Sequence, residues 1–313
     1  MPLAGGPLWF AHVQRLERGC APLRVAARDL PDAVVARLTG PRAPIAGLTL
    51  EAPRIMGIVN VTPDSFSDGG AYGGAAQAIA HGQMMALEGA DLIDVGGEST
   101  RPGAVTVPDA QEIARISPVV AGLADSRVSI DTRKAVVARE ALAQGAVLVN
   151  DVAGFTYDAA LAPLCIAQGV PVCIMHAQGD PETMQKAPRY DDVLLDVYEW
   201  LEARIAALEA QGMARSRMIV DPGIGFGKNV AHNLALLRGV AAFHGLGCAV
   251  LIGASRKGFI GTVGAEPDAQ KRIPGSVAVA LACVAQGVQI LRVHDVAATR
   301  QALALWQALR QEQ

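Results

Sequence analysis

The sequence predicts an α/β protein in which strands and helices alternate eight times, the pattern of a closed (β/α)8 barrel. From Arg54 onward, short apolar runs alternate with longer amphipathic stretches. The apolar runs carry no polar face, so both sides of the sheet must be covered, as in a parallel sheet packed against helices. Eight such units in about 260 residues fit a TIM barrel, and a doubly wound open sheet is the alternative.

Each predicted strand is a short apolar run that ends on a polar residue. The eight runs cover residues 55–61, 91–96, 127–131, 147–152, 170–176, 217–223, 249–255 and 289–295. The connecting helices include residues 74–89, 133–145, 192–212 and 232–243. Several helical stretches stop at a glycine, the residue preferred just after a helix end, and these are Gly89, Gly145, Gly169, Gly212 and Gly287.

Residues 1–50 differ from the rest of the chain. They are rich in proline, glycine, arginine and alanine and contain one short helical stretch, at residues 31–40. We expect them to form an N-terminal extension that decorates the barrel or covers its bottom. Residues 51–313 would then form the (β/α)8 barrel itself.

Composition limits the functions to consider. Hydrophobic residues make up 51% of the chain, which is enough for a large core. The net charge is −3 and there is no basic run, so we expect no nucleic-acid partner. No apolar run reaches membrane-spanning length, and the first residues do not resemble a secretory signal. We therefore expect a cytoplasmic protein with no membrane partner, whose five scattered cysteines are reduced core thiols.

Polar side chains stand at the carboxyl ends of nearly all predicted strands. They are Asn60, Asp94, Asp131, Asn150, His176, Asp221, Ser255 with Lys257, and Arg292 with His294. In a barrel these ends meet at one mouth. Taken alone, Asp131 could instead cap the helix that follows it. Taken alone, His176 is more typical of a core residue or of one that supports a site without binding the ligand. So many polar groups together indicate a shared pocket in which each is hydrogen-bonded or hydrated.

The types of these side chains indicate what the pocket binds. Asp221 and Asn150 can pair with the edge of a flat heterocycle that carries amino and oxo groups. A carboxylate accepts from N–H groups, whereas a carboxamide both donates and accepts. Arg292 and His294 are two residues apart on one strand and share a face, so with Asn60 they can cradle a phosphate or diphosphate.

Two polar loops follow the first two predicted strands. The first, NVTPDSFSDGG, has too many polar groups for a simple connector and is expected to cover a substrate. The second contains Thr100, Arg101 and Pro102, and Arg101 could clamp an anion or form a surface salt bridge. The glycine-rich turn at residues 223–228 lacks the spacing of nucleotide-binding motifs, so a nucleotide fold is not expected.

Eight segments resemble, in order, the motifs of the dihydropteroate synthase family of pterin-binding TIM barrels. They are GIVNVTPDSFSDGG, DVGGESTRPGA, SIDTRK, VNDVAG, MHAQGDPETMQ, DPGIGFGK, GASRKGFIG and RVHDV. The resemblance is specific, because the first two segments are diagnostic loop signatures and the set runs from Arg54 to Val296.

The resemblance implies a transferase of folate biosynthesis. In the family, 7,8-dihydropterin-6-ylmethyl diphosphate and 4-aminobenzoate condense to 7,8-dihydropteroate and diphosphate. The path is SN1-like: diphosphate leaves first, and the arylamine nitrogen then captures the pterin methylene cation. The resemblance also implies a homodimer and a target of sulfonamides.

The resemblance assigns the site residues by position. Pterin would be bound by Asp131, Asn150, Asp221 and Lys257. Diphosphate would be held by Asn60, Arg292 and His294, with the cofactor Mg²⁺ on Asn60. Aminobenzoate would be bordered by Phe66, Thr100, Arg101, Pro102 and Ser255. The catalytic residues would be Asp131, Lys257, Asp94 and Arg101, with Asp94 ordering the loops and ionised Asp131 stabilising the cation.

Two other functions are distinguishable from this one. A pterin-binding methyltransferase domain that serves a corrinoid partner would share the barrel but lack the diphosphate cradle and the NVTPDSFSDGG loop. A non-catalytic homologue acting as a binding or assembly subunit would have lost a loop or cradle residue. The sequence retains all of these residues.

Overall fold

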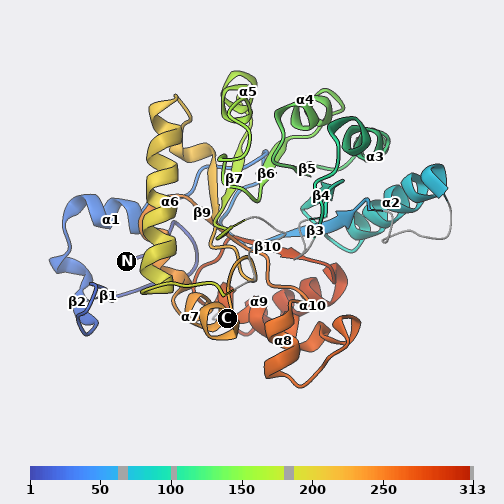
Figure 1. Ribbon diagram of the computed structural model, residues 1–313. Helices are drawn as coiled ribbons and strands as arrows, with labels where there is room; N and C mark the ends of the chain where they lie inside the picture. Colours follow the sequence, from blue (N-terminus) through green and yellow to red (C-terminus); the bar gives the residue numbers. More distant parts are fainter. Residues whose placement is uncertain (63–69, 100–103, 180–186, 311–313) are drawn as a thin grey trace.

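The computed structural model describes residues 1–62, 70–99, 104–179 and 187–310, and contains a closed parallel barrel (Figure 1). Its strands are β3 (Arg54–Asn60), β4 (Leu92–Gly96), β5 (Val128–Asp131), β6 (Leu148–Asp151), β7 (Val172–Met175), β8 (Met218–Asp221), β9 (Ala249–Ile252) and β10 (Ile290–Val293). They follow one another around the barrel in chain order, and β10 pairs with β3 to close it. This closure confirms the predicted barrel and excludes the doubly wound alternative.

Helices surround the barrel (Figure 1). They are α2 (Gly70–Leu87), α3 (Asp109–Gly122), α4 (Ala135–Ala143), α5 (Leu161–Gln168), α6 (Val193–Ala210), α7 (Val230–Arg238), α8 (Gly258–Val263), α9 (Ile273–Val284) and α10 (Val296–Ala308). All eight predicted strand segments overlap the observed strands. Most observed strands are a few residues shorter than the predicted runs, and several end on the polar residue itself, as β3 does at Asn60, β5 at Asp131 and β8 at Asp221.

The register of the strands brings their carboxyl ends into one layer. Asn60 on β3 aligns with Gly96 on β4, and Gly96 aligns with Asp131 on β5. Asp131 in turn aligns with Asn150 on β6. Polar residues that are far apart in the sequence are therefore level with one another at the barrel mouth.

The opposite end of the barrel is filled by apolar side chains. Inside the barrel, buried residues from seven strands form one cluster: Met56, Leu92, Leu148, Cys173, Ile219, Ala249 with Leu251, and Ile290. Ile45, Leu48 and Leu50, from the segment before β3, pack into the same cluster. Burying a side chain of this size contributes roughly 1.5–3 kcal/mol. The amino-terminal end is thereby closed, and polar chemistry is confined to the other end.

The first forty residues add a hairpin and a helix to one side of the barrel (Figure 1). β1 (His12–Arg15) pairs antiparallel with β2 (Leu23–Ala26), and α1 (Asp32–Thr39) follows. Arg18, between the two strands, forms ion pairs with Asp196 and Glu199 of α6 at 2.6 and 2.7 Å. The hairpin was not predicted, because its residues are mostly exposed and show no apolar alternation.

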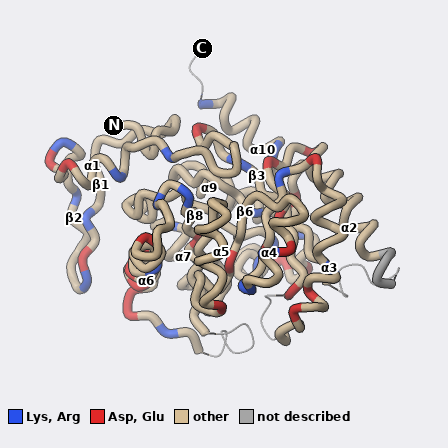
Figure 2. The backbone as a smooth tube through the Cα atoms, turned by 90° about the horizontal axis from the view of Figure 1, so that it is seen from above, with Lys and Arg blue, Asp and Glu red and all other residues tan. Residues whose placement is uncertain are grey.

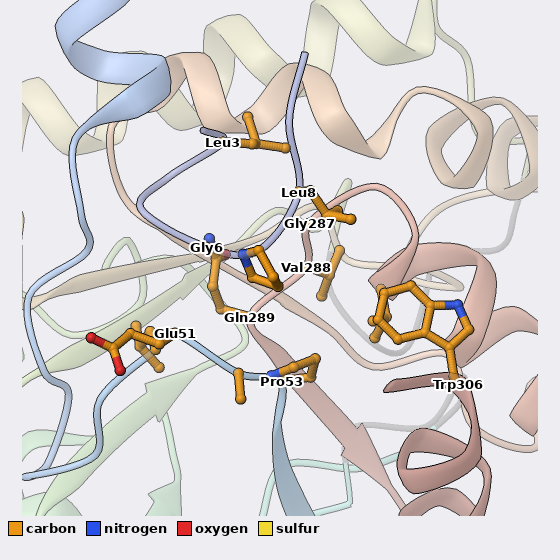
Figure 3. A pocket seen from close by; sticks show the side chains of 13 residues that line it. Leu3, Gly6, Leu8, Glu51, Pro53, Gly287, Val288, Gln289 and Trp306 are labelled. Atoms are coloured by element: carbon orange, nitrogen blue, oxygen red, sulfur yellow. The ribbon is translucent and has the colours of Figure 1, made fainter. Parts of the chain in front are cut away.

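Residues 3–8 lie against the amino-terminal end of the barrel. Four of them, Leu3, Gly6, Pro7 and Leu8, line a pocket together with residues such as Pro53, Val288, Gln289 and Trp306 (Figure 3). Pro53 directly precedes β3 and Gln289 directly precedes β10. The pocket is therefore at the end of the barrel opposite to the polar strand ends.

Basic and acidic residues are interspersed along the outer elements of the chain (Figure 2). Near α6, for example, Arg215 pairs with Glu209 at 2.6 Å and Arg37 lies 3.8 Å from Glu202. Within the described residues, no helix is long and apolar enough to cross a membrane.

Candidate active site

Arg292 joins the polar groups of three strands at the barrel mouth. Its Nε donates to Oδ2 of Asp94 at 2.5 Å, and its Nη2 donates to Oδ2 of Asp131 at 2.7 Å. Nδ2 of Asn150 donates to the same Asp94 oxygen at 3.0 Å. Four of the predicted site residues, from β4, β5, β6 and β10, therefore form one hydrogen-bonded group.

This group is buried, and burial controls its electrostatics. Asp94 is inaccessible to solvent, and the Asp131 side chain is 6% exposed. Burial raises the pKa of Asp131, while the charge of Arg292 opposes that rise. Although burial disfavours a cation, Asp94 and Asp131 raise the pKa of Arg292, so the guanidinium stays charged. Among the described residues, the buried oxygens Oδ1 of Asp94 and Oδ1 of Asp131 have no hydrogen-bond partner.

Asp131 does not cap the helix that follows it. Helix α4 begins at Ala135, and its first N–H donates to Oδ2 of Asp158 at 2.8 Å. The carboxylate of Asp131 turns to Arg292 instead. The sequence left open whether Asp131 caps a helix or belongs to the shared pocket. This geometry rules out the cap and leaves the carboxylate at the barrel mouth.

Asp221, which is buried, and Lys257, which is partly exposed, bring opposite charges to the mouth after β8 and β9, and each affects the pKa of the other. Oδ1 of Asp221 accepts from the N–H of Gly223 at 2.7 Å. Lys257 donates through Nζ to the carbonyl of Ile224, and its Nζ lies 4.2 Å from the centre of the Phe226 ring. Burial raises the pKa of Asp221. Burial lowers the pKa of Lys257 to about 7, with Asp221 opposing the shift.

The glycine-rich turn after β8 shapes this part of the mouth. Gly223 has a φ of +69°, and a Cβ there would lie 1.9 Å from the carbonyl oxygen of His176. Gly225 has a φ of +85°, and a Cβ there would lie 2.9 Å from Cδ of Lys257. Only glycine tolerates both the conformation and the contact. The glycine-rich turn therefore lets the side chain of Lys257 pack against its backbone, where it donates to the carbonyl of Ile224.

Lys228 and His176 pack against the glycine-rich turn. Nζ of Lys228 lies 2.9 Å from Nδ1 of His176 and donates to the carbonyl of Phe226 at 2.9 Å. The His176 ring stands edge-on to Trp200 at 5.0 Å. Burial lowers the pKa of His176 to about 3 and that of Lys228 to about 7. These contacts agree with the interpretation of His176 as a supporting residue.

Ser255 and His294 lie together just beyond the carboxyl ends of β9 and β10. Oγ of Ser255 is 3.1 Å from Nδ1 of His294 and accepts from the backbone N–H of His294 at 3.2 Å. Arg256, between Ser255 and Lys257, pairs with Asp295 and turns away from them. Phe66, Thr100, Arg101 and Pro102 lie outside the described residues.

Asn60 is the predicted ligand of Mg²⁺. It ends β3, is partly exposed, and lies level with Gly96 and Asp131. Within the described residues, no cluster of three or more His, Cys, Asp or Glu could hold a metal ion. Mg²⁺ keeps several waters and takes one or two protein oxygens together with substrate phosphates. A single carboxamide oxygen at a diphosphate cradle fits an ion of that kind, which would be bound together with the diphosphate.

Sequence reasoning missed a buried cluster of charges behind the mouth, formed by Glu98, Glu112, Arg133 and Lys134. The run Asp131-Thr132-Arg133-Lys134 contained the signal, because two adjacent cations directly after a buried strand end need anionic partners.

Comparisons of the sequence and of the structure with known proteins point to the same family. A family model described as pterin binding enzyme matches residues 56–294. The dihydropteroate synthase of Neisseria meningitidis serogroup B is 49% identical over 267 residues, which cover 83% of this chain and 94% of the relative. The structure of Xanthomonas albilineans dihydropteroate synthase with 4-aminobenzoic acid has a TM-score of 0.82 and 45% identity, covering 88% of this chain and all of the other. The same enzyme in complex with 7,8-dihydropteroate gives a TM-score of 0.79 at 43% identity, with 87% and 100% coverage.

The match across the barrel strands and their polar ends places the chain among the pterin-binding enzymes. Because relatives that it covers almost completely are nearly half identical, the chain belongs to the dihydropteroate synthase family, whose members are transferases.

Proposed function

We propose that the protein condenses 7,8-dihydropterin-6-ylmethyl diphosphate with 4-aminobenzoate. The C–O bond to diphosphate breaks and its electron pair leaves with diphosphate. The amine nitrogen then forms a C–N bond to the pterin methylene carbon and releases one proton to water, giving 7,8-dihydropteroate. The observation that carries the proposal is the mouth itself, where Asp131, Asn150 and Asp221 are buried at the ends of β5, β6 and β8. Lys257 follows β9 and lies in the same mouth, partly exposed. The related structures from Xanthomonas albilineans contain one substrate and the product.

In the proposed mechanism, Asp221 and Asn150 bind the amino and oxo edge of the pterin ring, and Lys257 binds an acceptor atom of the ring. The free oxygen of Asp131 faces the ring as well. An ionised carboxylate there stabilises positive charge that develops on the methylene carbon as diphosphate leaves. Burial raises the pKa of Asp131, so Arg292 matters for keeping it ionised.

Departure of the diphosphate depends on charge stabilisation at the other side of the mouth. Arg292 and His294 are proposed to hold its oxygens, and Asn60 would hold Mg²⁺, which when bound neutralises charge on the leaving group. No side chain needs to act as a nucleophile, because the amine attacks the carbon directly. Ser255 is proposed to border aminobenzoate, together with Phe66, Thr100, Arg101 and Pro102. On the family resemblance we also propose a cytoplasmic homodimer.

The test is a direct assay. Purified protein is mixed with Mg²⁺, the pterin diphosphate and 4-aminobenzoate, and dihydropteroate is measured by mass spectrometry. We expect product from the unmodified protein and little from Asp221→Asn, which removes the charge that accepts the pterin N–H groups. Arg300→Met is a matched control, because Arg300 pairs with Asp91 at the opposite end of β4. An unmodified protein that binds pterin but forms no product, and does not complement a folate-auxotrophic strain, would favour a non-catalytic homologue or a methyltransferase domain.

A further inference from the structure

The ammonium of Lys257 is held by a neighbouring loop. Its backbone follows β9, but its side chain lies against the glycine-rich turn after β8, at residues 223–228. Nζ of Lys257 donates to the carbonyl of Ile224 and lies 4.2 Å from the centre of the Phe226 ring. A Cβ on Gly225 would lie 2.9 Å from Cδ of Lys257, so the two are in close contact. The position of the ammonium therefore depends on the conformation of this turn.

The turn cannot hold that conformation by its own sterics. Gly223, Gly225 and Gly227 have φ values of +69°, +85° and +63°. Glycine adopts such angles readily, but it also restricts the chain less than any other residue. Three glycines at alternate positions leave the backbone with many alternative conformations, so hydrogen bonds from side chains have to select one of them.

Asn233, in the first turn of α7, holds the middle of the glycine-rich turn. Its Oδ1 accepts from the N–H of Gly225 at 2.7 Å. Its Nδ2 donates to the carbonyl of Asn229 at 2.8 Å and to that of Lys228 at 3.4 Å. Because the two N–H groups face carbonyl oxygens, the amide oxygen must face Gly225. Asn233 is 4% exposed, so this side chain ties the turn to α7 from within the protein.

Lys228 holds the next residue of the turn. Its Nζ donates to the carbonyl of Phe226 at 2.9 Å and to the carbonyl of His176 at 3.3 Å. The same Nζ lies 2.9 Å from Nδ1 of His176, and Lys228 is 3% exposed. The hydroxyl of Tyr190 donates to the carbonyl of Gly227 at 2.9 Å. The backbone that carries the Phe226 ring is therefore fixed by side chains.

We propose that Asn233 and Lys228 are positioning residues for Lys257. They fix the turn so that the carbonyl of Ile224 and the ring of Phe226 hold the ammonium where it meets the pterin ring. The inference rests on the proposed function, in which Lys257 binds an acceptor atom of that ring. Neither Asn233 nor Lys228 binds substrate itself. Support of this kind keeps a binding group within about 0.5 Å of its productive position.

The test is a double-mutant cycle in which binding of the pterin alcohol, 6-hydroxymethyl-7,8-dihydropterin, is measured by calorimetry. Asn233→Leu keeps the approximate shape of the side chain and removes the acceptor for the turn. Lys228→Met removes the donor to the turn. Each substitution is made in the unmodified protein and in Lys257→Met. The Lys257→Met protein still has Asp221 and Asn150 for the edge of the pterin ring, so its binding remains measurable.

Asn229→Ala is the matched control. Oδ1 of Asn229 caps the same helix, α7, by accepting from the N–H of His232 at 2.9 Å. Its removal should lower the thermal midpoint by weakening the start of α7. The hydrogen bonds of Asn233 and Lys228 to the turn do not involve the Asn229 side chain. The control therefore separates a loss of stability from a loss of positioning.

We expect Lys257→Met to weaken binding of the pterin alcohol about 10- to 100-fold, the range for a hydrogen bond from a charged group. Asn233→Leu and Lys228→Met should each weaken binding by a factor no larger than this, and neither should weaken it further in Lys257→Met. Losing the charge of Lys228 would by itself favour the Lys257 cation, so that charge cannot explain weaker binding in Lys228→Met. The control should bind like the unmodified protein.

Unchanged affinity in the single variants, or losses that add in full to that of Lys257→Met, would overturn the inference. An equal loss in Asn229→Ala would overturn it as well, because destabilisation alone would then be sufficient. If Asn233→Leu does not fold, Lys228→Met decides by the same cycle. A failure of the proposed function would look different, because the unmodified protein itself would then bind no pterin alcohol or form no dihydropteroate.

Discussion

Replacing Arg292 by methionine should lower the stability of the fold, because two buried carboxylates at the mouth share this one cation. Asp94 is inaccessible, Asp131 is 6% exposed, and the side chain of Arg292 is itself only 18% exposed. Methionine keeps much of the volume of arginine and removes the charge and all five donors. Both carboxylates would then be buried without their shared cation.

The magnitude follows from that burial. Removing one partner of a buried ion pair costs about 3–5 kcal/mol, because the other partner remains desolvated and unpaired. The cost should depend on pH. Burial raises the pKa of Asp131, and without Arg292 this rise is no longer opposed. Its folded-state pKa then lies further above its unfolded value, so the unfolded state binds fewer protons than the folded state. The stability of the variant therefore falls as pH rises through this range, and the loss should be larger at pH 8 than at pH 5.5.

Urea unfolding at both pH values measures this directly. The set comprises the unmodified protein, Arg292→Met, and Arg292→Met combined with Asp131→Asn. The double variant removes one of the stranded carboxylates, so it should recover roughly 1 kcal/mol or more at pH 8. Arg300→Met, whose partner Asp91 is more accessible, should show a small loss that is similar at both pH values. A loss in Arg292→Met that is equally large at pH 5.5 and pH 8, with no recovery in the double variant, would refute the reasoning.

Three further outcomes are expected. Asp131→Asn should lower turnover by about 10²–10³-fold and affect turnover far more than folding stability, because it removes the charge that faces the developing cation; normal turnover would remove Asp131 from the mechanism. The pKa of Lys257 is about 7 in the folded protein against an ordinary value of 10.5, so the unfolded state binds more protons between these values. Stability should therefore rise between pH 7.5 and 9, by up to about 1.4 kcal/mol per pH unit from this group. Lys257→Met should flatten that slope in urea titrations, and an unchanged slope would show that Lys257 is charged when folded. In calorimetry, 4-aminobenzoate and Mg²⁺ should each bind weakly alone and measurably only with diphosphate or pterin diphosphate; equal affinity in both states would mean a pre-formed pocket.

The barrel could be predicted from the sequence because its signal is local and repeated. Runs such as residues 127–131 are apolar on both faces and end on a polar residue, which determines both the parallel sheet and the location of the mouth. The hairpin of β1 and β2 could not be predicted, because its side chains are held by ion pairs such as Arg18 with Asp196 rather than by an apolar pattern. The family and its reaction class followed from motif order, and the comparisons confirm them.

The contacts within the candidate site were less accessible to sequence reasoning. The sequence places Asp94, Asp131 and Arg292 at the same end of the barrel. It does not show that the one guanidinium of Arg292 pairs with both carboxylates. That arrangement depends on side-chain direction across the barrel, which spacing along the chain does not contain. Likewise, Lys134 was visible only as part of a motif, although its partners Glu98 and Glu112 are 36 and 22 residues away.

The pairing at the mouth has a consequence for how the two halves of the pterin substrate act together. Arg292 donates to Asp131, and the same guanidinium is the group proposed to hold diphosphate. Arg292 has five N–H groups and gives one to Asp94 and one to Asp131, so the others are available to the proposed diphosphate while both carboxylates stay paired. Asp131 therefore keeps its cation while diphosphate is bound. In the proposed reaction, the charge of Asp131 is then present at the moment when the diphosphate leaves and positive charge develops on the methylene carbon.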